Sequence, residues 1–407
     1  MKCPVCENTI SKKWVFCPQC GINLREIDKR EGYSIDHIRA LWTERGGEQF
    51  IKNFKAVEVL STAPFKKIRP VRPILGDYVN VHISNLKTYS TVSTQPKVLE
   101  ELCETYRLLG YFTADLAYKS VKLSRIVDLI SRTEFYWKLL SLIETQKMLS
   151  DGWEKNHQAI IKIVKVDEKK HEVVYEISEG QVSYLEKDKP INFTELNILA
   201  GNLEATCNRR FIGEEIIESG KTYFKYNVVP HKAPQEYKRF KITAEESDEI
   251  VDTIVDYIVH NKPSGRKLKD NMHISGEQSD TYFMLKTSEG HRILEKYAGV
   301  KAGKKIAEKA KIQGEDEALR YIQKVFKQER IGLIEATNIT PEEITLKLTE
   351  SAYSSGVNNI NMKLDQFPAG IIEGILKQAT NKNWIAEETK CQSNGDPHCE
   401  ITCRRVS

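Results

Sequence analysis

The stretch Glu387-Glu-Thr-Lys-Cys391-Gln-Ser-Asn-Gly395-Asp-Pro-His-Cys399-Glu-Ile-Thr-Cys403 is the most diagnostic part of this chain. Its centre, Asn-Gly-Asp-Pro, is a strong turn signal and predicts that Cys391 and Cys399 lie on facing strands. Cys403 comes four residues after Cys399, so on a regular strand the two point to the same side, about 13 Å apart. His398 points to the opposite face. The pattern indicates either a metal site or thiols that pack as small hydrophobic side chains.

Together with Phe367-Pro-Ala-Gly370 upstream, this stretch resembles the 4-vinyl reductase domain family, whose pattern is E-x-x-C, a Gly-Asp turn and then C-x-[FI]. The resemblance covers about residues 275–407. It implies an α+β fold of helices packed on an antiparallel sheet, a pocket for a hydrophobic small molecule, and a homodimer. Members include sensor domains of aromatic-responsive transcription activators and an accessory protein of bacteriochlorophyll synthesis.

In the sensor members of this family, a zinc ion held by cysteines and a glutamate braces the ligand pocket. Glu388 matches that glutamate, so the resemblance implies that Glu388, Cys391 and Cys399 bind Zn²⁺, with Cys403 or His398 as the fourth ligand. The chain departs from the sensors because its upstream helix lacks the cysteine that they use.

Two parts of the chain show the same order of predicted elements, namely helices, a β-hairpin, a helix and short strands. Sequence matches accompany this order: Ala200-Gly-Asn-Leu-Glu-Ala205 with Ala369-Gly-Ile-Ile-Glu-Gly374, Ile212-Gly-Glu-Glu215 with Ile385-Ala-Glu-Glu388, and a weaker match of 109–118 with 298–307. We interpret them as an internal duplication. A degenerate copy would cover 34–235, a connecting helix and linker 243–272, and the second copy 275–407. The alternative is that the halves share only element order.

The first copy has lost the metal ligands. Glu218 stands where the second copy has Cys391, and Phe224 stands where it has Cys399. We therefore expect this half to bind no metal at that place. Cys103 and Cys207 are single cysteines on apolar helices and are expected in the core. In the same half, the alternating residues 78–83 predict a strand.

A second cysteine cluster opens the chain. Cys3-x-x-Cys6 and Cys17-x-x-Cys20 form two knuckles whose four thiolates suit tetrahedral Zn²⁺. A segment of this size cannot bury enough apolar surface to fold alone, so the metal would supply the folding free energy. Residues 1–26 therefore resemble a zinc ribbon. Such ribbons bind nucleic acid, dock proteins or cap a terminus.

The composition is that of an ordinary globular protein with two or three domains. The 407 residues are 40% hydrophobic and 29% charged, with a net charge of +4 that is too balanced to indicate nucleic acid by itself. No apolar run is long enough for a membrane span, and the first residues do not form a signal peptide. We therefore expect a cytoplasmic location and reduced cysteines. The lysines at 301–311 predict a solvated helix face.

The sequence contains no familiar catalytic motif. The phosphate-binding loop, the dinucleotide fingerprint, the nucleophile elbow and the His-Glu-x-x-His helix are all absent from it. The sequence therefore favours a non-catalytic, zinc-binding sensor or regulatory protein for a hydrophobic small molecule, with a protein partner at the ribbon. One alternative is an accessory factor or enzyme that acts on a tetrapyrrole. Another, less favoured, is a regulator that binds nucleic acid through the ribbon.

Overall fold

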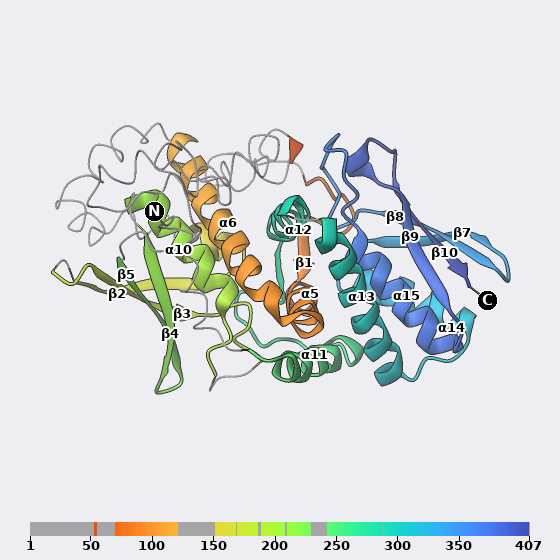
Figure 1. The fold of residues 1–407 in the computed structure, drawn as a ribbon, viewed down its shortest axis with the longest axis horizontal. Coiled ribbons are helices and arrows are strands. Elements are labelled where there is room, and N and C mark those ends of the chain that lie inside the picture. Colours follow the sequence, from red (N-terminus) through yellow and green to blue (C-terminus); the bar gives the residue numbers. More distant parts are fainter. Residues whose placement is uncertain are drawn as a thin grey trace, which may run out of the picture.

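The computed structural model describes residues 53–54, 70–120, 151–167, 169–185, 189–207, 210–228, 242–287 and 289–406. The predicted ribbon at 1–26 and a helix expected at 126–149 lie outside these residues. Two four-stranded antiparallel sheets lie at opposite ends of the long axis, with helices between them (Figure 1). The predicted α+β class is therefore confirmed. Among the described residues, no helix has the length and apolar character needed to cross a bilayer.

The elements follow one another in the same order in each half. The first half contains β1 (Tyr78–Asn80), α5 (Val81–Thr94), the 3-10 helix η1 (Pro96–Val98), α6 (Leu99–Ser120), β2 (Ile160–Asp167), β3 (Glu172–Ser178), α10 (Phe193–Cys207), β4 (Phe211–Glu218) and β5 (Lys221–Val228). After α11 (Ala244–Val259), the second half contains β6 (Asn271–His273), α12 (Ser275–Thr287), α13 (Glu289–Ala310), α14 (Glu315–Gln328), β7 (Leu333–Ile339), β8 (Glu343–Thr349), α15 (Gln366–Thr380), β9 (Trp384–Lys390), the 3-10 helix η3 (Gln392–Asn394) and β10 (Cys399–Arg405).

Each large sheet consists of two hairpins joined by one helix. The strand order is β2-β3-β5-β4 in the first sheet and β7-β8-β10-β9 in the second, and all neighbouring strands are antiparallel. The joining helices are α10 and α15. The hairpins predicted from the sequence are present in both halves. The buried side chains of both halves belong to one continuous hydrophobic core, and the predicted domain boundaries stay predictions.

Glycines allow two pairs of helices to pack at backbone contact, α6 with α10 and α13 with α15. A Cβ on Gly201 would lie 1.9 Å from the carbonyl oxygen of Arg107, and a Cβ on Gly374 would lie 2.3 Å from that of Val300. Such distances are far below van der Waals contact, so only glycine fits. The two glycines have equivalent roles in the two halves.

This equivalence shifts the alignment derived from the sequence. The sequence match placed Gly201 opposite Gly370, whereas the packing contacts place it opposite Gly374, one helical turn later. Glycines recur at four-residue spacing along α15. Both registers therefore satisfy a sequence comparison, and the contact with the neighbouring helix distinguishes them.

The strand predicted at 78–83 is wrong beyond Asn80. The Asn80 side chain accepts a hydrogen bond from the His82 N–H at 3.0 Å and caps α5, which begins at Val81. All residues of α5 except the last are buried, and the helix packs against α11 and α13. A helix that is covered on all sides has no polar face, so its sequence shows no helical period.

The lysines of α13 are not simply solvated, as the sequence had suggested. Three of them pair with aspartates of α11: Lys301 with Asp248 at 2.7 Å, Lys305 with Asp252 at 2.5 Å, and Lys309 with Asp256 at 3.0 Å. Both partners recur every four residues, which places each set on one helix face. The two parallel rows align α11 with α13, and the pairing depends on a partner distant in sequence.

We predict that Gly374→Ala destabilises the protein by about 1–3 kcal/mol, because the added methyl group would overlap the α13 backbone. Gly152→Ala is the matched control, since a Cβ there meets no atom within 4 Å. Urea unfolding of the full chain measures both. Equal midpoints for the two variants would show that the helices separate at no cost.

Candidate metal centre

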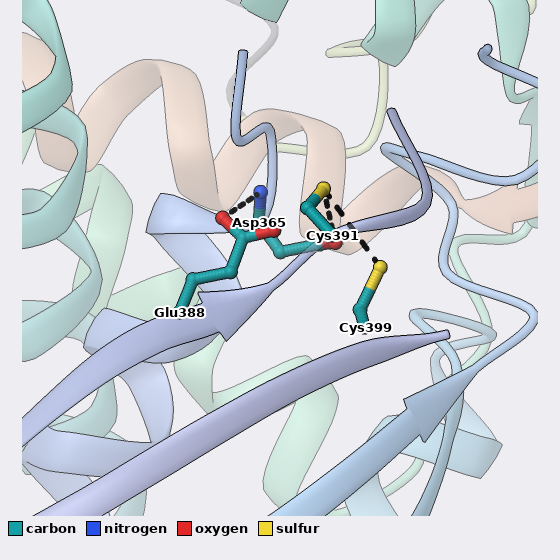
Figure 2. Close-up of side chains that lie close together, drawn as sticks. All are labelled: Asp365, Glu388, Cys391 and Cys399. Carbon is teal, nitrogen blue, oxygen red and sulfur yellow. Dashed lines mark hydrogen bonds between the residues drawn. The ribbon is translucent and has the colours of Figure 1, made fainter. Parts of the chain in front are cut away.

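Four potential metal ligands meet where β9 ends and β10 begins. Cys391 follows β9, η3 and Gly395 turn the chain, and Cys399 opens β10. Gly395 has φ 98°, a conformation that favours glycine, so the predicted turn is confirmed. Glu388 lies on β9, and Asp365 immediately precedes α15 (Figure 2).

These four side chains are buried and close enough to share one ion. One ligand atom from each, from Asp365, Glu388, Cys391 and Cys399, lies within 4.8 Å of all the others. The two Sγ atoms are 3.9 Å apart, and the Cys391 Sγ is 3.9 Å from Asp365 Oδ2. Zinc bound at typical ligand distances separates tetrahedral ligands by roughly 3.3–3.8 Å. The cluster therefore needs only a small contraction to hold the ion.

Hydrogen bonds hold Glu388 so that one of its oxygens has no partner. Glu388 Oε2 accepts hydrogen bonds from the Asp365 N–H at 3.0 Å and from Gln366 Nε2 at 2.9 Å. Glu388 Oε1 is buried and has no hydrogen-bond partner among the described residues. A buried carboxylate oxygen without a partner is unfavourable unless a cation or a proton satisfies it.

Serine hydroxyls and one main-chain amide orient the other three ligands. Ser351 and Ser354 donate to the two oxygens of Asp365, and the Asp365 side chain makes no capping bond to α15. The Gln392 N–H points at Cys399 Sγ from 3.3 Å, and the Ser393 hydroxyl lies 2.8 Å from Cys391 Sγ. Such outer contacts fix ligand orientation before a metal binds.

The electrostatics of the cluster favour a bound cation. Burial raises the pKa of Asp365 and raises that of Glu388 further. The hydrogen bond with Cys391, together with burial, raises the pKa of Cys399. Burial opposes ionisation of Cys391, but hydrogen bonds from Cys399, Glu388 and Ser393 outweigh it and lower its pKa. Four acids in one buried space cannot all ionise unless a divalent ion compensates them.

The structure brings together three of the predicted C-terminal ligands but neither candidate for the fourth. Cys403 is buried further along β10, opposite Ala386 and Ile344, and burial raises its pKa. His398 is partly exposed and lies 4.0 Å from Glu400. On a regular strand, Cys403 is too far along to reach the turn.

Asp365 takes the fourth place, and the sequence reasoning missed it. The family pattern directed attention to an upstream cysteine, whereas an aspartate also binds zinc. The available signal was an acidic residue two positions before Phe367, at the start of the helix that carries the family motif. The ribbon ligands Cys3, Cys6, Cys17 and Cys20 lie outside the described residues and stay a prediction.

The first half has the same framework without the sulfur ligands. Glu215 on β4 accepts a hydrogen bond from the Asn192 N–H, before α10, at 2.8 Å, as Glu388 does from Asp365. Phe224 is buried and Glu218 is exposed at the places of the two cysteines. Among the described residues, the Asp365 group is the one cluster of three or more potential ligands. Asn192 also donates to the buried Glu195, and burial raises the pKa of Glu215 to about 7.

An α+β fold with a buried thiolate–carboxylate cluster at a strand turn defines the class of this C-terminal domain. Residues 345–405 match the model of the vinyl-4-reductase domain family, so the chain carries a vinyl-4-reductase domain at its C terminus. It is also similar to an uncharacterized protein, MJ0150, of Methanocaldococcus jannaschii, with 25% identity over 147 residues, 36% of this chain and 84% of that protein.

Two solved structures are similar to part of the chain. One is a vinyl-4-reductase family protein from Methanocaldococcus jannaschii, with 21% identity, a TM-score of 0.23, and coverage of 28% of this chain and 68% of that one. The other is the phenol-responsive sensory domain of the transcription activator PoxR with phenol. It has 17% identity, a TM-score of 0.30, and coverage of 33% and 75%.

Glu215→Gln is predicted to make stability less dependent on pH. The folded pKa of Glu215 lies above its ordinary value of 4.5, so its stabilising contribution is present below pH 4.5 and is lost as pH rises through 7. The loss is on the order of 3 kcal/mol. Urea unfolding should therefore show the variant gaining on the wild type between pH 5.5 and pH 8. Parallel curves for both proteins would contradict this, and Glu214→Gln on the same strand is the matched control.

Proposed function

We propose that the C-terminal half binds one Zn²⁺ through Asp365, Glu388, Cys391 and Cys399. The observation that carries this proposal is a fully buried set of two thiols and two carboxylates within 4.8 Å, one of whose oxygens has no partner. Two sulfur and two oxygen donors suit zinc. A second zinc ion at Cys3, Cys6, Cys17 and Cys20 remains part of the proposal.

The role that fits this centre is structural. An ion there would join the end of β9, the start of β10 and the N-terminus of α15, three elements that meet only at this point (Figure 2). All four protein donors would be used, so no coordination position would stay open for a reacting water, unlike in catalytic zinc sites. A closed centre therefore supports a binding role rather than hydrolysis.

The proposed activity is the sensing of a hydrophobic small molecule by a domain that the metal braces. It is supported by the match to the vinyl-4-reductase domain family and by the resemblance of the C-terminal motif. A ligand regulates such a domain only if it binds one conformation better than another. Two open clefts of the structure, lined by 151–157 with 267–269 and by 313–320 with 339–341, Lys382 and Arg405, are mostly polar or charged. They suit an apolar ligand poorly, so the ligand site is expected between the helices and the sheet.

Native mass spectrometry of the full chain tests the metal proposal. We expect two zinc ions in the wild type and one in Cys391→Ser/Cys399→Ser. Cys403→Ser is the matched control, because it removes a buried thiol from the same strand but outside the cluster, and it should keep two. Circular dichroism confirms that each variant is folded. The same zinc content in all three proteins would overturn the C-terminal site.

Fluorescence of the apolar probe 1-aminoanthracene tests ligand binding separately. The zinc-loaded protein should give a saturable increase with about one probe per chain, and the Cys391→Ser/Cys399→Ser variant should bind at least tenfold more weakly, because its pocket has lost the brace. A linear, non-saturable increase in the wild type would refute the binding role while leaving the metal result intact.

A further inference from the structure

The two halves meet through elements that occupy matching positions in each. Strand β1 pairs with β6 in antiparallel orientation, with Val79 opposite Met272 at the centre. Each strand leads directly into a helix that contacts the other half, α5 against α13 and α12 against α6. Exchanging the two halves leaves this description unchanged, which is the property of a two-fold interface.

The main-chain hydrogen bonds that flank the strand pair are reciprocal. The Val81 N–H donates to the Asp270 carbonyl oxygen at 2.7 Å, and the Ile274 N–H donates to that of Asp77 at 3.0 Å. Each of these aspartates also closes a local turn through its carboxylate, because Asp77 accepts from the Val71 N–H and Asp270 accepts from the Ser264 N–H. The segments before the two strands therefore have the same local structure.

These segments also cross over, each reaching the sheet of the other half. The Ile74 N–H, before β1, donates to Glu350, which follows β8. The Lys267 N–H, before β6, donates to Glu179, which follows β3. Both glutamates have positive φ, 52° and 59°. The two carboxylates thus receive the two segments in the same way.

Two buried arginines repeat the exchange. Arg72 donates to the carbonyl oxygen of Arg330 at 2.6 Å, and Arg266 donates to that of His157 at 2.7 Å. Arg330 precedes β7 and His157 precedes β2, and their φ angles are 56° and 55°. Four independent pairs of contacts therefore obey one symmetry, which shared element order alone would not produce.

We propose that the chain is an internal pseudo-dimer, in which its two halves, related by a local two-fold axis between Val79 and Met272, occupy each other's interface. The surface formed by β1, α5 and the preceding segment takes as its partner the other half of the same chain. The family resemblance predicted this pairing between two copies. The protein is accordingly monomeric through this face.

The polar contacts beside the axis show why the halves are no longer interchangeable. Lys87 lies as far beyond Val81 as Asp280 lies beyond Ile274, and the two side chains pair at 2.5 Å. Lys87 also lies 3.1 Å from Glu277. In a symmetric dimer, a charge beside the axis approaches its own copy and is repelled. A tandem chain places opposite charges at these positions, so each half prefers the other half to a copy of itself.

Cysteine cross-linking tests which partner occupies the face. Asn80 and Asn271 are opposite each other in the β1–β6 pair, so Asn80→Cys/Asn271→Cys should form a disulfide within one chain on mild oxidation. Non-reducing electrophoresis should then show a monomer with changed mobility, and native mass spectrometry should show 46.7 kDa per particle. The single variants are controls for the native thiols. A covalent dimer that only the double variant forms would overturn the proposal.

Charge exchange tests the pair beside the axis. Lys87→Asp places like charges together in a buried site and should lower the melting temperature by roughly 10 °C. Lys87→Asp/Asp280→Lys restores opposite charges and should recover at least half of that loss. The double variant should also remain monomeric by native mass spectrometry. No recovery, or a dimer of the wild type that the single variant abolishes, would contradict an internal, charge-matched interface.

Discussion

One interaction determines the arrangement of both halves: a buried glutamate on a strand accepts a hydrogen bond from the first amides of a helix. Glu388 binds the Asp365 N–H, and Glu215 binds the Asn192 N–H. The partly positive N-terminus of a helix stabilises a carboxylate at that place. The bond fixes where each joining helix begins relative to its sheet. In the second half it also brings Asp365 to the two cysteines, so the candidate metal centre depends on it.

Burial gives this interaction two different outcomes. In both halves, removal from water raises the pKa of the strand glutamate, since the charged form loses its hydration. The second half surrounds the glutamate with three further acids, and a divalent cation relieves all four together. The first half offers Asn192 and a single neighbouring glutamate, so a proton suffices there. The same backbone framework therefore supports a metal site in one half and a protonated carboxylate in the other.

The sequence was most informative where a residue's role depends on its near neighbours. The turn at Gly395, the two hairpins and most helices follow from local patterns, and three of the four clustered ligands lie within one short stretch. Asp365 joins them only because α15 packs back against β9, a contact that no local pattern contains. For the same reason α5 was mistaken for a strand: its burial comes from α11 and α13, which are distant in sequence.

The pseudo-two-fold arrangement also explains how a polar helix can be wholly buried. Lys87, Ser84 and their neighbours on α5 would be unfavourable in an apolar core. They lie beside the axis, where α12 brings complementary groups, so Lys87 meets Asp280 and Ser84 donates to Glu277. Burial opposes the charge on Lys87, but these acids outweigh it and raise its pKa. Removing either partner alone leaves a buried charge uncompensated, which costs more than the pair contributes. The centre of the molecule is therefore specified by pairing between its halves, as a subunit interface would be, and the two halves can diverge elsewhere as long as this pairing is kept.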